Sequence, residues 1–264
     1  MITNITRFDR VVNDYENYRP SYPRELIHLL QKQTGFRTID IVADIGSGTG
    51  ISSSLFVENR NVVYAVEPND KMRTIAERKF ENDLQFISVN GTAENTSLRE
   101  KSIDLIFCGQ AFHWFDVTKA IKEFERILKP GGCAVLAWNE RDQSSKFQQA
   151  YEKMLCSRVE GYRKKSEDQN LQERIEMFFE PQKPYVGTIA HTHLYDLTSL
   201  KGRLRSSSFC PEKGSHGYEQ LFSELKHLFY TFEENGMISF DYVTKVYIGS
   251  LQKHSNASTT GIPV

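Results

Sequence analysis

The chain has 264 residues, of which 39% are hydrophobic, 25% are charged and 12% are aromatic. This composition is ordinary for a soluble globular protein and excludes collagen, coiled coils and a wholly disordered chain. The formal net charge of -1 offers no excess of positive charge that would attract a nucleic acid, so we expect no nucleic-acid partner.

The apolar segments are too short to cross a membrane. The longest apolar run, Cys133–Trp138, falls far short of the roughly 20 residues that span a bilayer, so we expect no membrane partner. The first basic residue, Arg7, is not followed by the apolar segment that a secretory signal requires. The four cysteines are widely spaced and form no C-x-x-C pair. We therefore expect a cytoplasmic protein with reduced thiols.

Short β-branched runs alternate with segments of helical periodicity from residue 39 to residue 138. One such segment, Val117–Leu128, places its apolar residues on one face of a helix, and Pro130–Gly132 provides a stop after it. This alternation is typical of stacked βαβ units with a parallel sheet. The five strands expected in this part are Ile39–Ile45, Val62–Val66, Leu84–Val89, Ile103–Cys108 and Cys133–Trp138.

The pattern changes after Trp138. Residues 144–180 are charged and have helical periodicity, and a second helical stretch is Tyr218–Phe232. Val186–Leu194 and Tyr242–Gly249 are extended, and we expect them as an antiparallel pair that completes a seven-stranded, mostly parallel sheet. The expected fold is therefore a single α/β domain with helices on both faces of the sheet.

We divide the chain into four parts. Residues 1–38 are expected as an N-terminal lid with the first helices, and residues 39–138 as a ligand-binding core. Residues 139–252 supply a helical cap and the last two strands of the same domain. Residues 253–264, rich in small and polar residues, are expected as a disordered tail.

Three glycines lie where the first strand passes into the first helix of the core. In Asp44–Gly50 the glycines occupy positions 46, 48 and 50, whereas a dinucleotide fingerprint would place the third where Ile51 stands. Asp44 would repel a nearby pyrophosphate but would attract the ammonium of an adenosyl ligand. Glu67 lies 21 residues beyond Gly46, at the position from which a carboxylate accepts hydrogen bonds from ribose hydroxyls. The alternative is a tight strand-to-helix turn that holds no ligand.

Five segments, in their order and spacing, resemble the class I S-adenosylmethionine-dependent methyltransferases. A narrower likeness, to the small-molecule branch similar to trans-aconitate methyltransferase, rests on Tyr18–Pro23 together with Phe112–Trp114. The resemblance implies a Rossmann-like fold, S-adenosylmethionine as the cofactor and methyl transfer to a small-molecule acceptor. The five segments are Val42–Gly50, Val66–Pro68, Gly91–Glu94, Phe107–Phe115 and Leu128–Gly132.

The resemblance also implies where the cofactor lies. Its methionine part would lie over the glycine turn, with Asp44 at the ammonium and Arg19 at the carboxylate. Glu67 would hold the ribose, and Met72 would lie against the adenine face. The other implied contacts are Gly46, Ser47 and Gly48 in the turn, Pro68 beside Glu67, Thr92, Ala93 and Glu94 at the adenine edge, Gln110 and Ala111 toward the sulfonium, and Tyr15, Tyr18 and Tyr22 as lid aromatics.

His113 and Trp114 are the candidate catalytic residues. Methyl transfer requires the two reactants in near-attack geometry, and a base is needed only where the acceptor is protonated. His113, at the carboxyl end of the fourth strand, could act as that base or position the acceptor, or it could be satisfied by local hydrogen bonds. Trp114 could place its π face near the cationic sulfonium or pack under the sheet edge.

Three further groups of side chains favour structural interpretations. His191 and His193 lie on one face of an extended segment, but no third ligand follows at a useful spacing, so we expect no metal site. Arg203 and Arg205 could clamp an anionic substrate, but we interpret them as a solvated basic face. The charged run Arg158–Arg174 is expected on the outer face of the inserted helices.

A small molecule is the expected methyl acceptor. Enzymes of this class that methylate exocyclic amines of nucleic acids carry an Asn/Asp-Pro-Pro-aromatic segment after the fourth strand, where this chain has Gly109–Phe112. Two alternatives remain, namely a protein that binds the cofactor without catalysis, such as a sensor, and a nicotinamide-dependent oxidoreductase. The residues specify neither the acceptor atom nor an oligomeric state.

Overall fold

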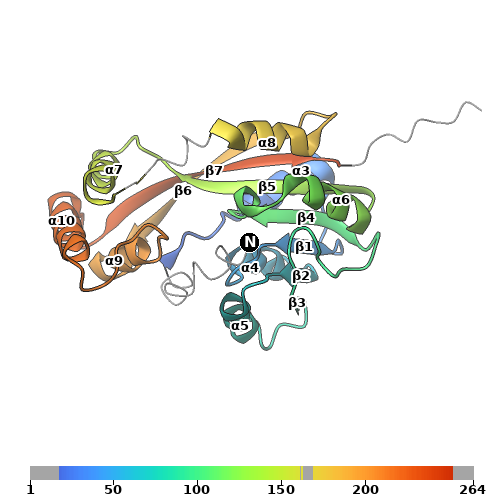
Figure 1. Cartoon of the computed structure of the whole chain (residues 1–264), viewed down its shortest axis with the longest axis horizontal. Coiled ribbons are helices and arrows are strands. Elements are labelled where there is room, and N and C mark those ends of the chain that lie inside the picture. The colour runs from blue at the N-terminus through green and yellow to red at the C-terminus, as the bar shows by residue number, and fades with distance from the viewer. Residues whose placement is uncertain (1–17, 161, 163–168, 252–264) are drawn as a thin grey trace, which may run out of the picture.

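The computed structural model describes residues 18–160, 162 and 169–251. Residues 1–17 of the expected lid, Tyr15 included, and the expected tail 253–264 lie outside these residues. Within them, one sheet carries helices on both faces, and a further group of helices lies at one end of the sheet (Figure 1).

The sheet has seven strands in the order β3-β2-β1-β4-β5-β7-β6. The strands from β3 to β5 pair in parallel, whereas β7 is antiparallel to both β5 and β6. The prediction of a mostly parallel sheet that ends in an antiparallel pair is confirmed. The strands are β1 (Val42–Ile45), β2 (Val63–Val66), β3 (Phe86–Val89), β4 (Ile103–Gly109), β5 (Leu128–Arg141), β6 (Tyr185–Tyr195) and β7 (Ile238–Gly249).

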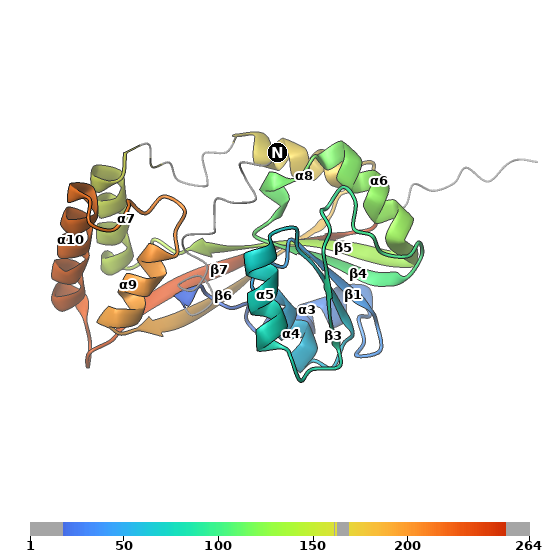
Figure 2. The same ribbon diagram turned by 60° about the horizontal axis from the view of Figure 1, so that its bottom comes forward.

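Both faces of the central strands need an apolar cover, because neighbouring strand residues point to opposite sides. Val42 of β1 belongs to a core that includes Leu26 and Phe56, whereas Ala43 belongs to a core that includes Phe124. The first side is covered by α3 (Glu25–Thr34) and α4 (Ile51–Glu58), the second by α6 (Val117–Ile127) and α8 (Gln169–Phe179), and α5 (Asp70–Lys79) lies beside β3 (Figure 2). None of the helices in the described ranges is long and apolar enough to cross a membrane.

Helix α6 and strand β5 follow each other without a loop. The side chain of Asp116 caps α6 by accepting a hydrogen bond from the Lys119 amide at 3.2 Å, and the apolar face predicted from the sequence is buried. Strand β5 begins at Leu128, five residues earlier than Cys133, its expected start. The pairing register slips between Leu128 and Cys133, so Pro130–Gly132 lies in an irregular stretch of the strand that tolerates proline and glycine.

A third apolar core lies at the far ends of β6 and β7. It is built by α7 (Lys146–Arg158), α9 (Leu197–Arg205) and α10 (His216–Phe232), which lie together at one end of the molecule (Figures 1 and 2). We call these three helices the cap. The expected helical region 144–180 therefore divides, because α7 joins the cap whereas α8 packs on the sheet beside α6. Helix α9 was not predicted from the sequence.

Candidate functional site

The three glycines of the turn after β1 all have left-handed backbone angles, with φ values of 71°, 59° and 79° at Gly46, Gly48 and Gly50. A Cβ at Gly46 would approach the Ala111 Cβ to 2.6 Å, and one at Gly50 would approach the Phe80 ring to 2.6 Å. A Cβ at Gly48 would meet only the Met72 sulfur, at 3.7 Å. Gly46 and Gly50 therefore serve packing, whereas a Cβ at Gly48 would make only an ordinary contact with Met72 among the described residues.

Asp44, the third of the four residues of β1, is a fully buried carboxylate. Its Oδ2 atom accepts hydrogen bonds from the hydroxyls of Ser52 at 2.7 Å and Ser53 at 2.6 Å, both on α4. Its Oδ1 atom is also buried but has no hydrogen-bond partner among the described residues. Burial raises the pKa of Asp44 to about 6, although the two hydroxyls act in the opposite direction. A cation at Oδ1, such as an ammonium, would satisfy this oxygen and favour the ionised form.

Glu67 links the end of β2 to the glycine turn. The Gly48 amide donates to its Oε2 atom at 2.9 Å, and the Asn69 amide donates to its Oε1 atom at 2.8 Å. Burial raises the pKa of the Glu67 carboxyl, and the Asn69 and Gly48 amides oppose that effect. Each oxygen keeps a second lone pair that could accept from a ribose hydroxyl. Replacement of Glu67 would therefore disturb the turn as well as any ligand.

The residues expected at the adenine lie around the first turns of α5 and α6. Met72 is buried at the start of α5, where its amide donates to the Asn69 side chain at 3.0 Å and its sulfur lies beside Gly48. Pro68 directly precedes this capping residue. Thr92 forms an isolated bridge with Asn95, and Ala93 between them is buried. Glu94 accepts a hydrogen bond from the Asp116 amide at 2.8 Å, so one of its oxygens holds the start of α6.

Gln110 has an unusual backbone at the carboxyl end of β4. Its φ of 58° lies in the left-handed region, which a residue other than glycine adopts at an energetic cost. The Gln110 amide donates to the Ala137 carbonyl at 2.9 Å, and its side-chain Nε2 donates to the Asn139 carbonyl at 3.0 Å. These bonds to β5 hold the strained residue in place and direct the chain so that Ala111 packs on Gly46.

His113 lies on a 3-10 turn, Phe112–Trp114, that α8 anchors. Arg174 of α8 donates to the carbonyls of His113 at 3.2 Å and Phe115 at 2.7 Å, and its guanidinium lies 5.6 Å from the Phe112 ring centre. Phe112 is fully buried, whereas Trp114 is 38% exposed with its ring 4.6 Å from that of His113. Phe112 therefore fills the space under the sheet edge that was one option for Trp114.

The position of Arg174 contradicts its interpretation as a residue of an outer helix face. Arg174 belongs to the charged run that was expected on such a face, but its guanidinium points to the turn that carries His113. Nothing in the local sequence distinguishes it from its charged neighbours, because its acceptors lie about 60 residues earlier in the chain. The structure thus adds Arg174 as a residue that positions the candidate catalytic turn.

The N-terminal residues expected around the cofactor contact three different places. The Tyr18 ring lies against Gly202 of α9, and Arg19 donates from Nη2 to the Ser206 carbonyl at 2.7 Å. Tyr22 is buried in the core, where its ring meets Phe107 edge-on at 5.4 Å. Residues 18 and 19 thus dock on the cap, and Tyr22 packs beneath β4.

The interpretation of Arg203 as part of a solvated basic face is wrong. Arg203 is 4% exposed, and its Nε atom donates to the Tyr242 hydroxyl at 2.9 Å.

Burial lowers the pKa of His191 to about 4, and the His191 Nε2 atom lies 3.0 Å from the Thr244 hydroxyl. No group of three or more potential metal ligands occurs in the described part of the chain.

Comparison with known proteins supports the resemblance on the core. Residues 43–136 match the family model described as a methyltransferase domain. An uncharacterized methyltransferase of Mycobacterium tuberculosis is 38% identical over 136 residues, which cover 52% of this chain and 53% of that protein. An uncharacterized methyltransferase of Schizosaccharomyces pombe is 33% identical over 139 residues, which cover 52% and 54% of the two chains. This chain thus matches about half the length of these relatives.

A solved structure extends the likeness in fold beyond the core. The structure described as a type II methyltransferase from Anaeromyxobacter dehalogenans has a TM-score of 0.67 and 19% sequence identity to this chain. The superposition covers 90% of this chain and 100% of that one. The likeness in this Rossmann-like α/β fold therefore extends well beyond residues 43–136.

Replacement of Gly48 tests whether the turn holds a ligand. In Gly48→Val, a branched side chain would occupy the space over the turn, so we expect no measurable binding of S-adenosylhomocysteine by calorimetry. Gly35→Val is the matched control, because Gly35 has a φ of 72° and nothing within 4 Å of its Cβ position but lies after α3. Both variants carry a backbone strain of about 1–2 kcal/mol. Retained binding in Gly48→Val would make the turn purely structural.

Asp44→Asn should stabilise the protein at high pH. The folded-state pKa of Asp44, about 6, lies above its ordinary 3.8, so the folded protein binds more protons between these values and loses stability as pH rises through them. The ionised carboxylate therefore costs about 3 kcal/mol above pH 6. Urea unfolding should show Asp44→Asn to be more stable than the wild type at pH 8 and nearly equal to it at pH 4. If Asp44→Asn is less stable than the wild type at pH 8, the conclusion that burial raises the pKa of Asp44 is contradicted.

Proposed function

We propose that this protein, whose residues 43–136 form a methyltransferase domain, transfers a methyl group from S-adenosylmethionine to a small-molecule acceptor. The observation that carries the proposal is the buried Asp44 Oδ1 atom, which lacks a partner among the described residues. It precedes a glycine turn in which a Cβ at Gly48 would contact only the Met72 sulfur of those residues, at 3.7 Å. An ammonium at this place would pair with the carboxylate and compensate for its burial. The amino group of S-adenosylmethionine supplies such an ammonium.

The same groups argue against a nicotinamide dinucleotide. A pyrophosphate at the turn would meet the buried carboxylate of Asp44. It would also need the backbone donors of the turn, but the Gly48 amide already donates to Glu67 at 2.9 Å. Charge and hydrogen bonding therefore both favour a ligand with a cationic group over one with a diphosphate.

We assign the remaining contacts by their place around the turn. Glu67 would accept from the ribose, Met72 would cover the adenine face, and Ala93 and Glu94 would meet the adenine edge. Gly46 and Ser47 would lie beneath the methionine part, with Gln110 and Ala111 closer to the reacting end. Arg19 and Tyr18 would approach the cofactor carboxylate from the cap side. Tyr22, Pro68 and Thr92 would support these residues from the core, from the start of α5 and from the bridge to Asn95.

When bound, S-adenosylmethionine supplies an electrophilic methyl carbon on a sulfonium. A lone pair of the acceptor forms the new bond to this carbon, and the electron pair of the broken carbon–sulfur bond remains on sulfur. A protonated acceptor also releases a proton, which we assign to His113. Trp114 is partly exposed beside His113, and we assign to its π face a contact with the cationic sulfonium. Arg174 and Gln110 hold the backbone on which these groups lie.

A small acceptor fits the net charge of -1 and the sequence Gly109–Phe112 after β4. We further propose kinship with the small-molecule branch similar to trans-aconitate methyltransferase, on the basis of Tyr18–Pro23 and Phe112–Trp114. A relative in Saccharomyces cerevisiae, named as a probable S-adenosylmethionine-dependent methyltransferase, is 30% identical over 124 residues, 45% of this chain and 42% of that protein. Its name agrees with the cofactor proposed here.

Two measurements test the function. Calorimetry with S-adenosylhomocysteine and with NAD should show binding of the first ligand only. Incubation of the protein with a metabolite extract and isotopically labelled S-adenosylmethionine should then yield a labelled product by mass spectrometry. Binding of NAD in place of S-adenosylhomocysteine would indicate an oxidoreductase, and binding without any labelled product would indicate a non-catalytic cofactor-binding protein.

Replacement of His113 separates a base from a positioning residue. If His113 accepts the proton, His113→Ala should lower kcat by about 10²–10⁴ with little change in cofactor affinity, and the rate should lose its dependence on pH at the acidic side. If His113 only positions the acceptor, KM should rise while kcat stays nearly level. His227→Ala, which removes an exposed histidine of the cap, is the control. Unchanged kcat and KM in His113→Ala would exclude both roles.

A further inference from the structure

Strand β6 forms one edge of the sheet. It is the last strand in the order, and its 11 residues pair with β7 over their whole length without a shift in register. Within the described ranges, no other strand or loop forms backbone hydrogen bonds with β6. Its outer side therefore presents a row of amide and carbonyl groups over about 37 Å.

This strand lacks the features with which proteins usually protect such an edge, namely a short length, a charged side chain, a proline or a bulge. It contains no Asp, Glu, Lys, Arg or proline. Burial lowers the pKa of His191 to about 4 and also lowers that of His193, so both rings are neutral at physiological pH. The opposite edge strand, β3, has only four residues. Strand β6 is therefore the edge that is suited to pairing with a further strand.

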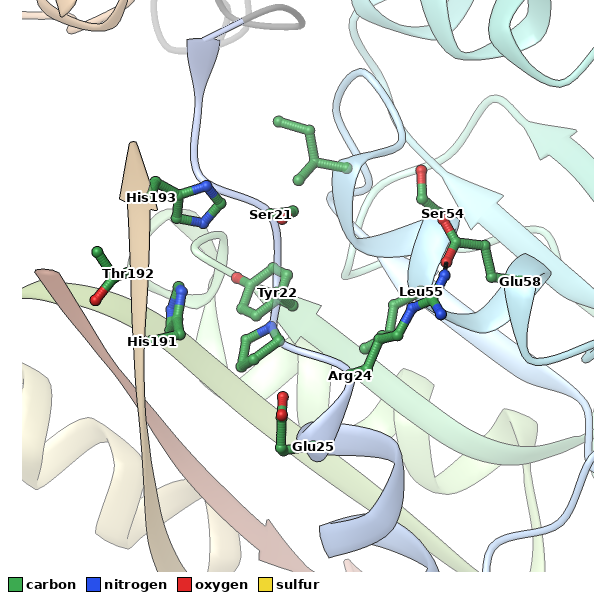
Figure 3. A pocket seen from close by; sticks show the side chains of 12 residues that line it. Ser21, Tyr22, Arg24, Glu25, Ser54, Leu55, Glu58, His191, Thr192 and His193 are labelled. Atoms are coloured by element: carbon green, nitrogen blue, oxygen red, sulfur yellow. Dashed lines mark hydrogen bonds and ion pairs between the residues drawn. The ribbon is translucent and has the colours of Figure 1, made fainter. Parts of the chain in front are cut away.

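Both faces of β6 leave space for side chains of a further strand. One face carries five exposed side chains, those of Val186, Thr188, Ala190, Thr192 and Leu194. The two large apolar ones, Val186 and Leu194, are 51% and 61% exposed. On the other face, His191 and His193 point toward a pocket of about 430 Å³ between β6 and the first turns of α3 and α4 (Figure 3).

The residues of the exposed face are arranged symmetrically about Ala190. Thr188 and Thr192 flank Ala190, and Val186 and Leu194 flank the two threonines. In an antiparallel pair of identical strands, a two-fold axis places each residue opposite the one that lies equally far beyond the centre. A second copy of β6 centred on Ala190 would thus pair Val186 with Leu194 and Thr188 with Thr192.

This register suits the side chains better than its neighbours do. Pairs of apolar residues and pairs of threonines across two strands stabilise a sheet. A centre at Ile189 or at His191 would instead place a threonine opposite Val186 or Leu194. Ala190 is also the midpoint of Tyr185–Tyr195, so only this centre pairs all 11 residues. The full pairing would form about ten to twelve backbone hydrogen bonds between the copies.

Opposite charges would meet at both ends of this pairing. Lys183 precedes β6 and Asp196 follows it, and both are exposed. With the centre at Ala190, Asp196 of one copy lies opposite Pro184 of the other, and therefore next to Lys183. Charge complementarity and the symmetric order of side chains together favour a second copy of this chain over an unrelated strand.

We propose that the protein forms a two-fold symmetric dimer in which β6 pairs antiparallel with β6 of a second copy, in the register centred on Ala190. The two seven-stranded sheets would then form one continuous sheet. Two single strands bury less than the roughly 800 Å² per partner of a standard interface, so the population of this dimer depends on protein concentration. The inference is independent of the proposed function.

Disulfide trapping tests the register. Ala190→Cys is made in a Cys156→Ser background, because Cys156 is exposed. The two new cysteines would lie opposite each other, with Cα atoms about 4.5–5.5 Å apart, so mild oxidation should yield a covalent dimer on a non-reducing gel.

Thr188→Cys in the same background is the matched control, because Thr188 is exposed on the same face of β6. Its two copies would lie four residues apart along the pair, or about 13 Å, which a disulfide cannot span. We expect Thr188→Cys to cross-link about tenfold more slowly than Ala190→Cys, or less. Equal rates in the two variants would overturn the inference.

Sedimentation velocity tests the dimer of the wild type. We expect the dimer fraction to rise between about 1 and 100 µM protein. Ala190→Lys would place two positive charges opposite each other and should raise the dissociation constant about tenfold or more. Thr231→Lys, which adds the same charge at an exposed position of α10, should leave it within about twofold. A wild type that stays monomeric over this range, or a dimer that Ala190→Lys does not weaken, would contradict the proposed pairing and leave the edge to another protein or to another segment of this chain.

Discussion

The buried carboxylate of Asp44 is the constraint around which the core is arranged. It stands at the end of β1, a strand whose four residues are all buried, and α4 binds it through the Ser52 and Ser53 hydroxyls. This arrangement fixes the angle at which α4 leaves the turn, and it leaves Oδ1 as the oxygen that still requires a partner. The glycines, the Glu67 contact to Gly48 and the strained Gln110 all surround this point.

The contacts of the proposed cofactor site and those of the cap differ in how far apart the contacting residues lie in the sequence. The cofactor side is local, because Glu67 reaches Gly48 across 19 residues within a single βαβ unit. The contacts at the cap join distant segments, since Arg19 contacts Ser206 across 187 residues and Arg203 contacts Tyr242 across 39. The cap has an apolar core of its own, separate from the two cores that cover the sheet.

The same division explains how much the sequence predicts. The strands of the parallel part and the apolar face of α6 follow from residues close in the chain, and the glycine turn with Asp44 and Glu67 has a fixed spacing. Helix α9 has no such signal, because it is nine residues long and contains Gly202 and several polar residues. Arg174 and Arg203 look like surface residues in the sequence, and only contacts with distant segments show that Arg174 is half-buried and Arg203 buried. The left-handed Gln110 likewise depends on its bonds to β5.

The release of protons on ligand binding tests the central role of Asp44 most directly. At pH 6 the carboxyl, with a pKa of about 6, is about half protonated in the free protein, and an ammonium at Oδ1 would ionise it. Calorimetry of S-adenosylhomocysteine binding at pH 6 in MES and in bis-tris, buffers of different ionisation enthalpy, should therefore show release of about half a proton, with none in Asp44→Asn. Binding heats that do not depend on the buffer in the wild type, or proton uptake, would contradict the account.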